Sequence, residues 1–244
     1  MWSHVKNNAA KILFVSGSLI LLGALVFLIW NFWPDIALET GYQWQQLRQR
    51  INPSQAEVTN SYDHPLVKVT EISTTDITTD NNVLSALKQD LINTYAPVFP
   101  DYGIVIPKIN ANARIVEDVD PYNLDIYSKA LSLGIAQAAG TAAPGTNGNT
   151  FLFAHSGRHF YEGINENVQF YLLDKLSEGD EILIFKAGNT YIYQVTATMR
   201  VWPEDTSYLT KQDYDYNLLT LMSCWPAGVN YQRQIVQAKL TAAF

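Results

Sequence analysis

The chain contains one cysteine, Cys224, and its sequence context favours a working thiol. A lone cysteine cannot form an internal disulfide, so it is either a small buried hydrophobe or a reactive group. An apolar run with strand propensity occupies residues 218–222, and Trp-Pro-Ala-Gly at 225–228 ends that run at once. We therefore expect Cys224 at the end of a strand, where a rigid sheet can present its side chain to a cleft.

His155 is the histidine best placed to act with this thiol. It ends a short strand-like run at residues 150–154, which follows a turn-rich segment at residues 144–149. A histidine at a strand end can be purely structural. Paired with a cysteine, it could keep the thiol ionised and later protonate a leaving amine.

Arg233 follows Cys224 within an alternating stretch, residues 231–240, that is typical of a strand. A hairpin over residues 225–230 would fold this strand back, antiparallel to the cysteine strand, and bring Arg233 near Cys224. A guanidinium stays charged and offers five donors, so it could hold a substrate carbonyl or an oxyanion. The alternative is a solvent-facing arginine on a half-exposed strand.

The elements that must position these residues are mostly short strands, with a hairpin turn signal at Gly188-Asn189. Helical segments are predicted at residues 122–139 and 170–176. Few helices among many short strands favour a closed or nearly closed β-barrel. The predicted strands cover residues 104–109, 113–117, 150–155, 181–186, 190–201, 218–224 and 231–240.

Together these residues carry a family resemblance. The string TLMSCWPAGVNYQR at residues 220–233 resembles the signature of sortases, the cysteine transpeptidases of bacterial cell surfaces, and is closest in style to class D/E. The segments at 104–109, 113–116, 131–134 and 144–155 follow the family's order of strands, helix, turn, strand and histidine. The resemblance covers about residues 101–244 and implies a mainly β, eight-stranded barrel.

The resemblance implies catalytic roles for Cys224, His155 and Arg233. Ser223 and Trp225 flank the nucleophile and are candidate substrate-binding residues, although strand packing explains either equally well. The sequence departs from the family where Ser223 replaces the usual threonine and Ala154 replaces the common glycine. Neither departure removes a catalytic group.

The implied reaction is acyl transfer through a thioester, on surface proteins that carry a C-terminal sorting motif of the LPxTG type. The resolving amine would come from a cell-wall precursor or a pilin lysine. Two alternatives stay open. An L,D-transpeptidase would also use cysteine, histidine and arginine, but its SHGC-type motif is absent. A noncatalytic surface β-domain would have a merely buried Cys224 that reacts slowly with alkylating agents.

An uncharged apolar run at residues 12–30 is long enough to cross a bilayer as a helix. Lysines precede it and acidic residues follow, which predicts a cytoplasmic N-terminus at residues 1–11 and an extracellular catalytic domain at residues 101–244, held at the cell membrane. A cleaved signal peptide is the alternative, but the apolar run is longer than is usual for one. Residues 31–100 are expected to form a juxtamembrane linker with helical parts. A helix at residues 83–95 within it should pack on the domain or, alternatively, form a lid.

Composition limits the possible partners and cofactors. The net charge of −7 and the lack of a Lys/Arg cluster argue against nucleic acid. The connection at residues 202–217 contains Glu204, Asp205, Asp213 and Asp215, whose oxygens could bind Ca²⁺. Because their spacing matches no defined Ca²⁺ loop, the prediction is a solvated acidic loop, with no metal site and no cofactor.

Overall fold

The computed structural model describes residues 2–51, 86, 89–157 and 169–244. The chain divides into two compact units, Met1–Thr70 and Glu71–Phe244. The described part of the first unit is one helix, α1 (Trp2–Ile51), which continues beyond the apolar run at residues 12–30 on both sides. Within the described part of the chain, no helix combines the length and the apolar character needed to cross a membrane. The transmembrane helix expected at residues 12–30 is therefore not found.

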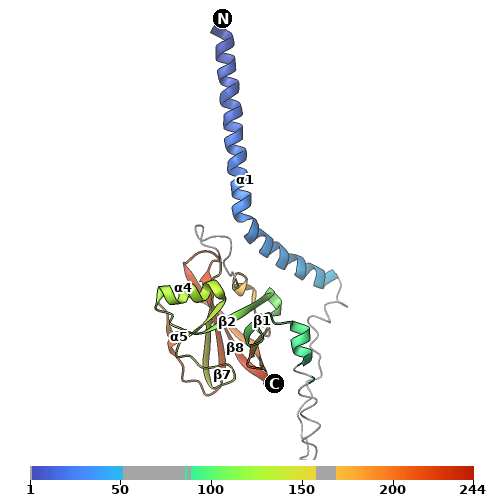
Figure 1. Cartoon of the computed structure of the whole chain (residues 1–244), viewed down its shortest axis with the longest axis vertical. Helices are drawn as coiled ribbons and strands as arrows, with labels where there is room; N and C mark the ends of the chain where they lie inside the picture. Colours follow the sequence, from blue (N-terminus) through green and yellow to red (C-terminus); the bar gives the residue numbers. More distant parts are fainter. Residues whose placement is uncertain (1, 52–85, 87–88, 158–168) are drawn as a thin grey trace, which may run out of the picture. The chain divides into compact units, whose positions relative to one another are not determined.

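In the second unit, eight strands form a closed barrel in the order β1-β2-β3-β4-β7-β8-β6-β5. This confirms the expected mainly β, eight-stranded architecture, and Figure 1 shows its strands beside the short helices α4 and α5. The strands are β1 (Tyr102–Ile106), β2 (Ala111–Val119), β3 (Ile135–Ala138), β4 (Gly148–Phe153), β5 (Glu181–Lys186), β6 (Asn189–Val201), β7 (Asn217–Trp225) and β8 (Gln232–Ala243).

Two of the neighbouring strand pairs in this barrel are parallel, β2 with β3 and β4 with β7. The β4–β7 pair has a direct consequence for the site, because the carboxyl ends of parallel strands meet at the same edge of a sheet. Apolar side chains fill the core: Ile104, Phe151, Leu152, Ile184, Tyr193 and Leu221 are among those almost fully buried.

The segment at residues 122–139, predicted as one helix, divides into a helix and a strand. The helix α4 (Leu124–Leu133) begins at Asn123, whose side chain accepts a hydrogen bond from the amide of Ile126 at 3.2 Å. After Gly134 the chain extends into β3, which is buried along its whole length between β2 and β4. The prediction was wrong at residues 135–138 because pairing on both sides outweighs local helix propensity.

The other short elements also differ in detail from the predictions. Residues 170–176 contain only the 3₁₀ turn η2 (Leu173–Lys175), and residues 107–109 form the 3₁₀ turn η1 (Pro107–Ile109). The connection after β6 includes α5 (Ser207–Thr210). The β5–β6 turn consists of Ala187 and Gly188, both at positive φ, so it lies one residue before the predicted Gly188-Asn189.

The described part of the helix predicted at residues 83–95 is helical over residues 89–95. Its side chains Leu91, Ile92 and Tyr95 pack against a buried cluster of Val105, Leu183 and Phe185. These three cluster residues belong to β1 and β5. Residues 89–95 therefore pack on β1 and β5, whereas the cysteine lies on β7 and the histidine follows β4. This agrees with the prediction that the helix packs on the domain.

Candidate active site

The hairpin predicted between the cysteine strand and the arginine strand is confirmed. Strands β7 and β8 are antiparallel, and Cys224 is the direct partner of Arg233 in their register. Directly opposed residues of an antiparallel pair point to the same face, with their Cβ atoms about 4.5–5.5 Å apart. Both residues are partly exposed. The thiol and the guanidinium therefore share one side of the sheet.

His155 reaches the same edge of the barrel through the parallel β4–β7 pair. Phe153 is the partner of Met222, and the amide of Ala154 donates to the carbonyl of Met222 at 3.1 Å. His155 follows two residues after Phe153, as Cys224 follows two residues after Met222, so both residues come directly after this last paired position. The amide of the fully buried Phe170 donates to the carbonyl of His155 at 3.3 Å, which ties this strand end to the core.

A residue that the sequence analysis did not single out, Asn230, completes the cluster. Nη1 of Arg233 donates to Oδ1 of Asn230 at 2.5 Å and to the carbonyl of Gln232 at 3.2 Å. Sγ of Cys224 lies 3.7 Å from the same Oδ1, within hydrogen-bonding range for sulfur. The only sequence signal was the place of Asn230 in the short hairpin between the two residues.

The loops that follow the two strand ends touch through glycine. A Cβ atom on Gly157 would lie 2.4 Å from both the Cα and the amide nitrogen of Gly228. The backbone after His155 therefore contacts the backbone after Cys224 directly. This close approach fixes the spacing between the histidine loop and the cysteine loop.

The comparison with known proteins identifies the family of the barrel domain. The family model described as "Sortase domain" matches residues 104–241, which is more than half of the chain. The chain belongs to the sortase family. This confirms the resemblance carried by the motif at residues 220–233.

Individual sortases match with moderate identity. Sortase D of Bacillus subtilis (strain 168) is 27% identical over 137 residues, which are 55% of this chain and 60% of Sortase D. Sortase C-1 from Actinomyces oris is 27% identical, with a TM-score of 0.50 over 63% of this chain and 81% of that one. The Sortase D5 transpeptidase of Clostridium perfringens is 30% identical, with a TM-score of 0.47 over 65% of this chain and 89% of that one.

Burial raises the pKa of the Cys224 thiol, and the charge of Arg233 offsets only part of this effect. The thiol of the free sortase is therefore protonated at neutral pH, because desolvation disfavours the thiolate. Slow alkylation at neutral pH is then expected of a catalytic Cys224 as well as of a structural one. Alkylation rate alone cannot separate the sortase from the noncatalytic alternative.

Ser223 and Trp225 occupy positions that favour packing. Ser223 is only 3% exposed and, by strand alternation, points to the opposite face from Cys224. The Trp225 ring lies under the guanidinium of Arg200, 3.7 Å from its Cζ atom, and the Trp225-Pro226 peptide bond is cis. Their assignment as substrate-binding residues stays a prediction.

The acidic connection between β6 and β7 is tied to the barrel. The Asn149 side chain accepts from the Thr220 hydroxyl and donates to the carbonyl of Tyr208, both at 2.8 Å. The carboxylate of Asp205 accepts from the amide and the hydroxyl of Ser207. Among the residues that the structure describes, no three His, Cys, Asp or Glu side chains gather as metal ligands do. The expected lack of a cofactor stays a prediction.

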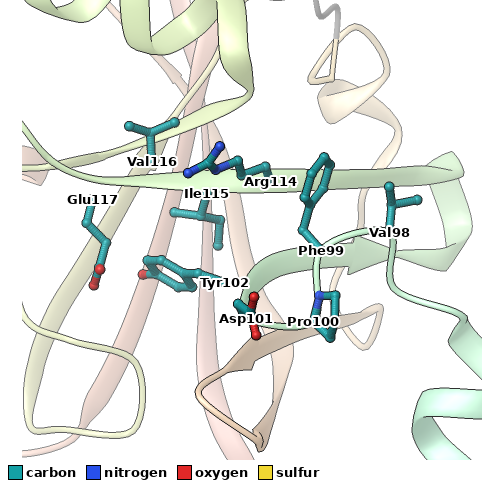
Figure 2. A pocket seen from close by; sticks show the side chains of 9 residues that line it. All are labelled: Val98, Phe99, Pro100, Asp101, Tyr102, Arg114, Ile115, Val116 and Glu117. Atoms are coloured by element: carbon teal, nitrogen blue, oxygen red, sulfur yellow. The ribbon is translucent and has the colours of Figure 1, made fainter.

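A pocket of about 570 Å³ lies at β1 and β2. Figure 2 shows the rings of Phe99 and Tyr102 and the charged groups of Arg114 and Glu117 around it. None of the three candidate catalytic residues contributes to its lining, and no cysteine or histidine does. The pocket is therefore separate from the candidate site.

The glycine contact between the two loops makes a testable prediction. Gly157→Ala should force the histidine loop away from Gly228, and a shift of about 1 Å in a catalytic group can lower the rate about 100-fold. We expect acyl transfer to fall steeply, as measured by product formation. Gly41→Ala is the control, since Gly41 lies in α1 and has no atom within 4 Å of the added Cβ. Equal losses in the two variants would contradict the role of the contact.

Proposed function

We propose that this sortase is a cysteine transpeptidase that cleaves an LPxTG-like sorting motif in surface proteins and transfers the acyl group to an amine. The observation that carries the proposal is the direct pairing of Cys224 with Arg233, beside the parallel strand end that holds His155. This arrangement supplies a nucleophile, a cation for the oxyanion and a proton carrier within one cluster.

The first half of the reaction breaks the peptide bond. Burial disfavours the thiolate, so the thiol proton passes to the imidazole of His155 as the substrate is engaged. Sγ then attacks the scissile carbonyl carbon, and Arg233 donates to the oxygen that becomes negative. The C–N bond breaks, the imidazolium protonates the departing amine, and an acyl thioester remains on Cys224.

The second half resolves the thioester. An incoming amine, from a cell-wall precursor or a pilin lysine, loses a proton to His155 as it attacks the thioester carbonyl. A new amide bond forms, the C–S bond breaks, and the thiol recovers its proton. The LPxTG-like motif and the amine acceptor are inferred from membership of the sortase family. They are not inferred from Sortase D itself, since this chain spans only 60% of the length of that protein.

Sortases are associated with the cell surface, and we place this catalytic domain there on that basis. The proposal does not depend on a membrane helix, which the described residues do not contain. The L,D-transpeptidase alternative is not supported, since the matching family model is the sortase domain.

A peptide screen tests the proposed reaction. The full chain is incubated with a library of LPxTG-like peptides and amine acceptors, and products are identified by mass spectrometry. We expect one class of motif to give an amine-linked product. A Cys224→Ala variant is the control and should give none. If the wild-type chain yields no product with any peptide, or if both proteins yield the same products, the proposal is wrong.

A further inference from the structure

Asn230 makes contacts with both reactive side chains of the hairpin. We propose that Asn230 is a positioning residue whose side-chain oxygen occupies, in the free enzyme, the place that the scissile carbonyl oxygen takes between Cys224 and Arg233. The Asn230 oxygen thereby holds the guanidinium of Arg233 in the orientation that the substrate needs. The carbonyl oxygen of the substrate then displaces the Asn230 oxygen. This inference rests on the proposed transpeptidase function.

The geometry matches that of a substrate carbonyl. Oδ1 of Asn230 is an amide oxygen, the same kind of acceptor as the oxygen of a peptide bond. It accepts from Arg233 at 2.5 Å and lies 3.7 Å from Sγ of Cys224. A carbonyl under attack by Sγ must likewise place its oxygen within reach of the guanidinium, and its carbon next to the sulfur.

The hairpin holds Asn230 in this place without a ligand. The amide of Val229 donates to the carbonyl of Pro226 at 2.8 Å, which closes the turn before Asn230. Gly228 adopts a positive φ of 74° and touches Gly157. Arg233 lies on β8, the next strand, so its long side chain would have many orientations without the Asn230 acceptor.

An asparagine suits this task because its oxygen is neutral. An aspartate would pair with the guanidinium by charge and compete with the incoming carbonyl. A leucine has nearly the same shape and offers no acceptor. The groups that face the thiol are Arg233 from β8 and Asn230 from the hairpin, and His155 follows β4, the strand paired with β7 on its other side.

The two substitutions should move the ionisation of Cys224 in opposite directions. Asn230→Leu removes the acceptor of the thiol proton and frees Arg233 to turn toward the sulfur, so the thiolate is favoured. Asn230→Asp adds a negative charge nearby, so the thiolate is disfavoured. We expect the pH midpoint of Cys224 alkylation by iodoacetamide to fall by about 0.5 pH units or more in Asn230→Leu. In Asn230→Asp it should rise by a similar amount.

Acyl transfer supplies the second measurement. Asn230→Leu should lower kcat/KM by about tenfold or more, because the guanidinium is no longer held. Asn230→Asp should lower it mainly through a higher KM, since the carboxylate competes for Arg233. Val229→Ala is the matched control: Val229 is 52% exposed in the same hairpin, and alanine keeps its backbone hydrogen bond. Val229→Ala should change neither the pH midpoint of Cys224 alkylation nor the kcat/KM of acyl transfer.

The outcome of the alkylation series decides the inference. Opposite shifts of the midpoint, with transfer lowered in both variants, support the positioning role. Unchanged midpoints, or shifts in the same direction, overturn it, and so does full transfer activity in Asn230→Leu. Alkylation needs no peptide, so a wild-type chain that transfers nothing would refute the proposed function while this series still tests the Asn230 contact.

Discussion

Replacing Cys224 by serine is expected to abolish acyl transfer while the barrel stays folded. A hydroxyl proton is far harder to remove than a thiol proton, so the serine cannot form the acyl-enzyme at a useful rate. The two side chains have nearly the same volume, and thermal unfolding should therefore hardly change. The measurement is the rate of amine-linked product formation, together with the unfolding temperature of each protein. Retained cleavage and transfer in Cys224→Ser would contradict the assignment.

His155→Ala is expected to stop turnover as well, because the departing amine loses its proton donor. The losses in the two variants should not multiply, since residues that act as one unit are not additive. The double variant should be about as inactive as either single variant. A double variant far less active than both would indicate that the two residues act independently.

Arg233→Lys is expected to lower transfer steeply without unfolding the protein. Lysine keeps the charge but loses the planar fork that can donate to two oxygens at once. The loss of one transition-state donor typically lowers the rate about 10² to 10³-fold. The measurement is kcat/KM for a peptide found in the screen.

Arg200→Lys is the matched control for this change. Arg200 is exposed on β6, where its guanidinium lies over the ring of Trp225. We expect nearly unchanged transfer in this variant. If Arg233→Lys transfers at close to the wild-type rate, Arg233 is an ordinary strand residue and its assigned role is wrong.

The sequence alone was sufficient to predict the hairpin at the centre of the site. The apolar run before Cys224, the turn residues after it and the alternation around Arg233 are local patterns, and β7 and β8 follow them. That the strand before His155 neighbours the strand of Cys224 depends on the parallel pairing of β4 with β7, two strands far apart in the chain. No local pattern specifies such a pairing, so the sequence could place His155 at a strand end but could not show which strand would lie next to it.

Features that depend on the assembled barrel could not be predicted from local patterns. Residues 135–138 become β3 because β2 and β4 flank them, although they follow a helix directly. The raised pKa of Cys224 comes from burial, which no motif encodes. The sequence analysis left the protonation state of the thiol open, and burial in the barrel favours the protonated form.

The most direct test of the account is to locate the acyl group on the enzyme. The full chain is mixed with a reactive LPxTG-like peptide in the absence of an amine, the reaction is quenched in acid, and the intact mass and the proteolytic fragments are determined. The account predicts an adduct with the mass of the peptide's acyl portion, bound to Cys224 and absent from Cys224→Ala. An adduct on any other residue, or peptide cleavage with no adduct in either protein, would contradict it.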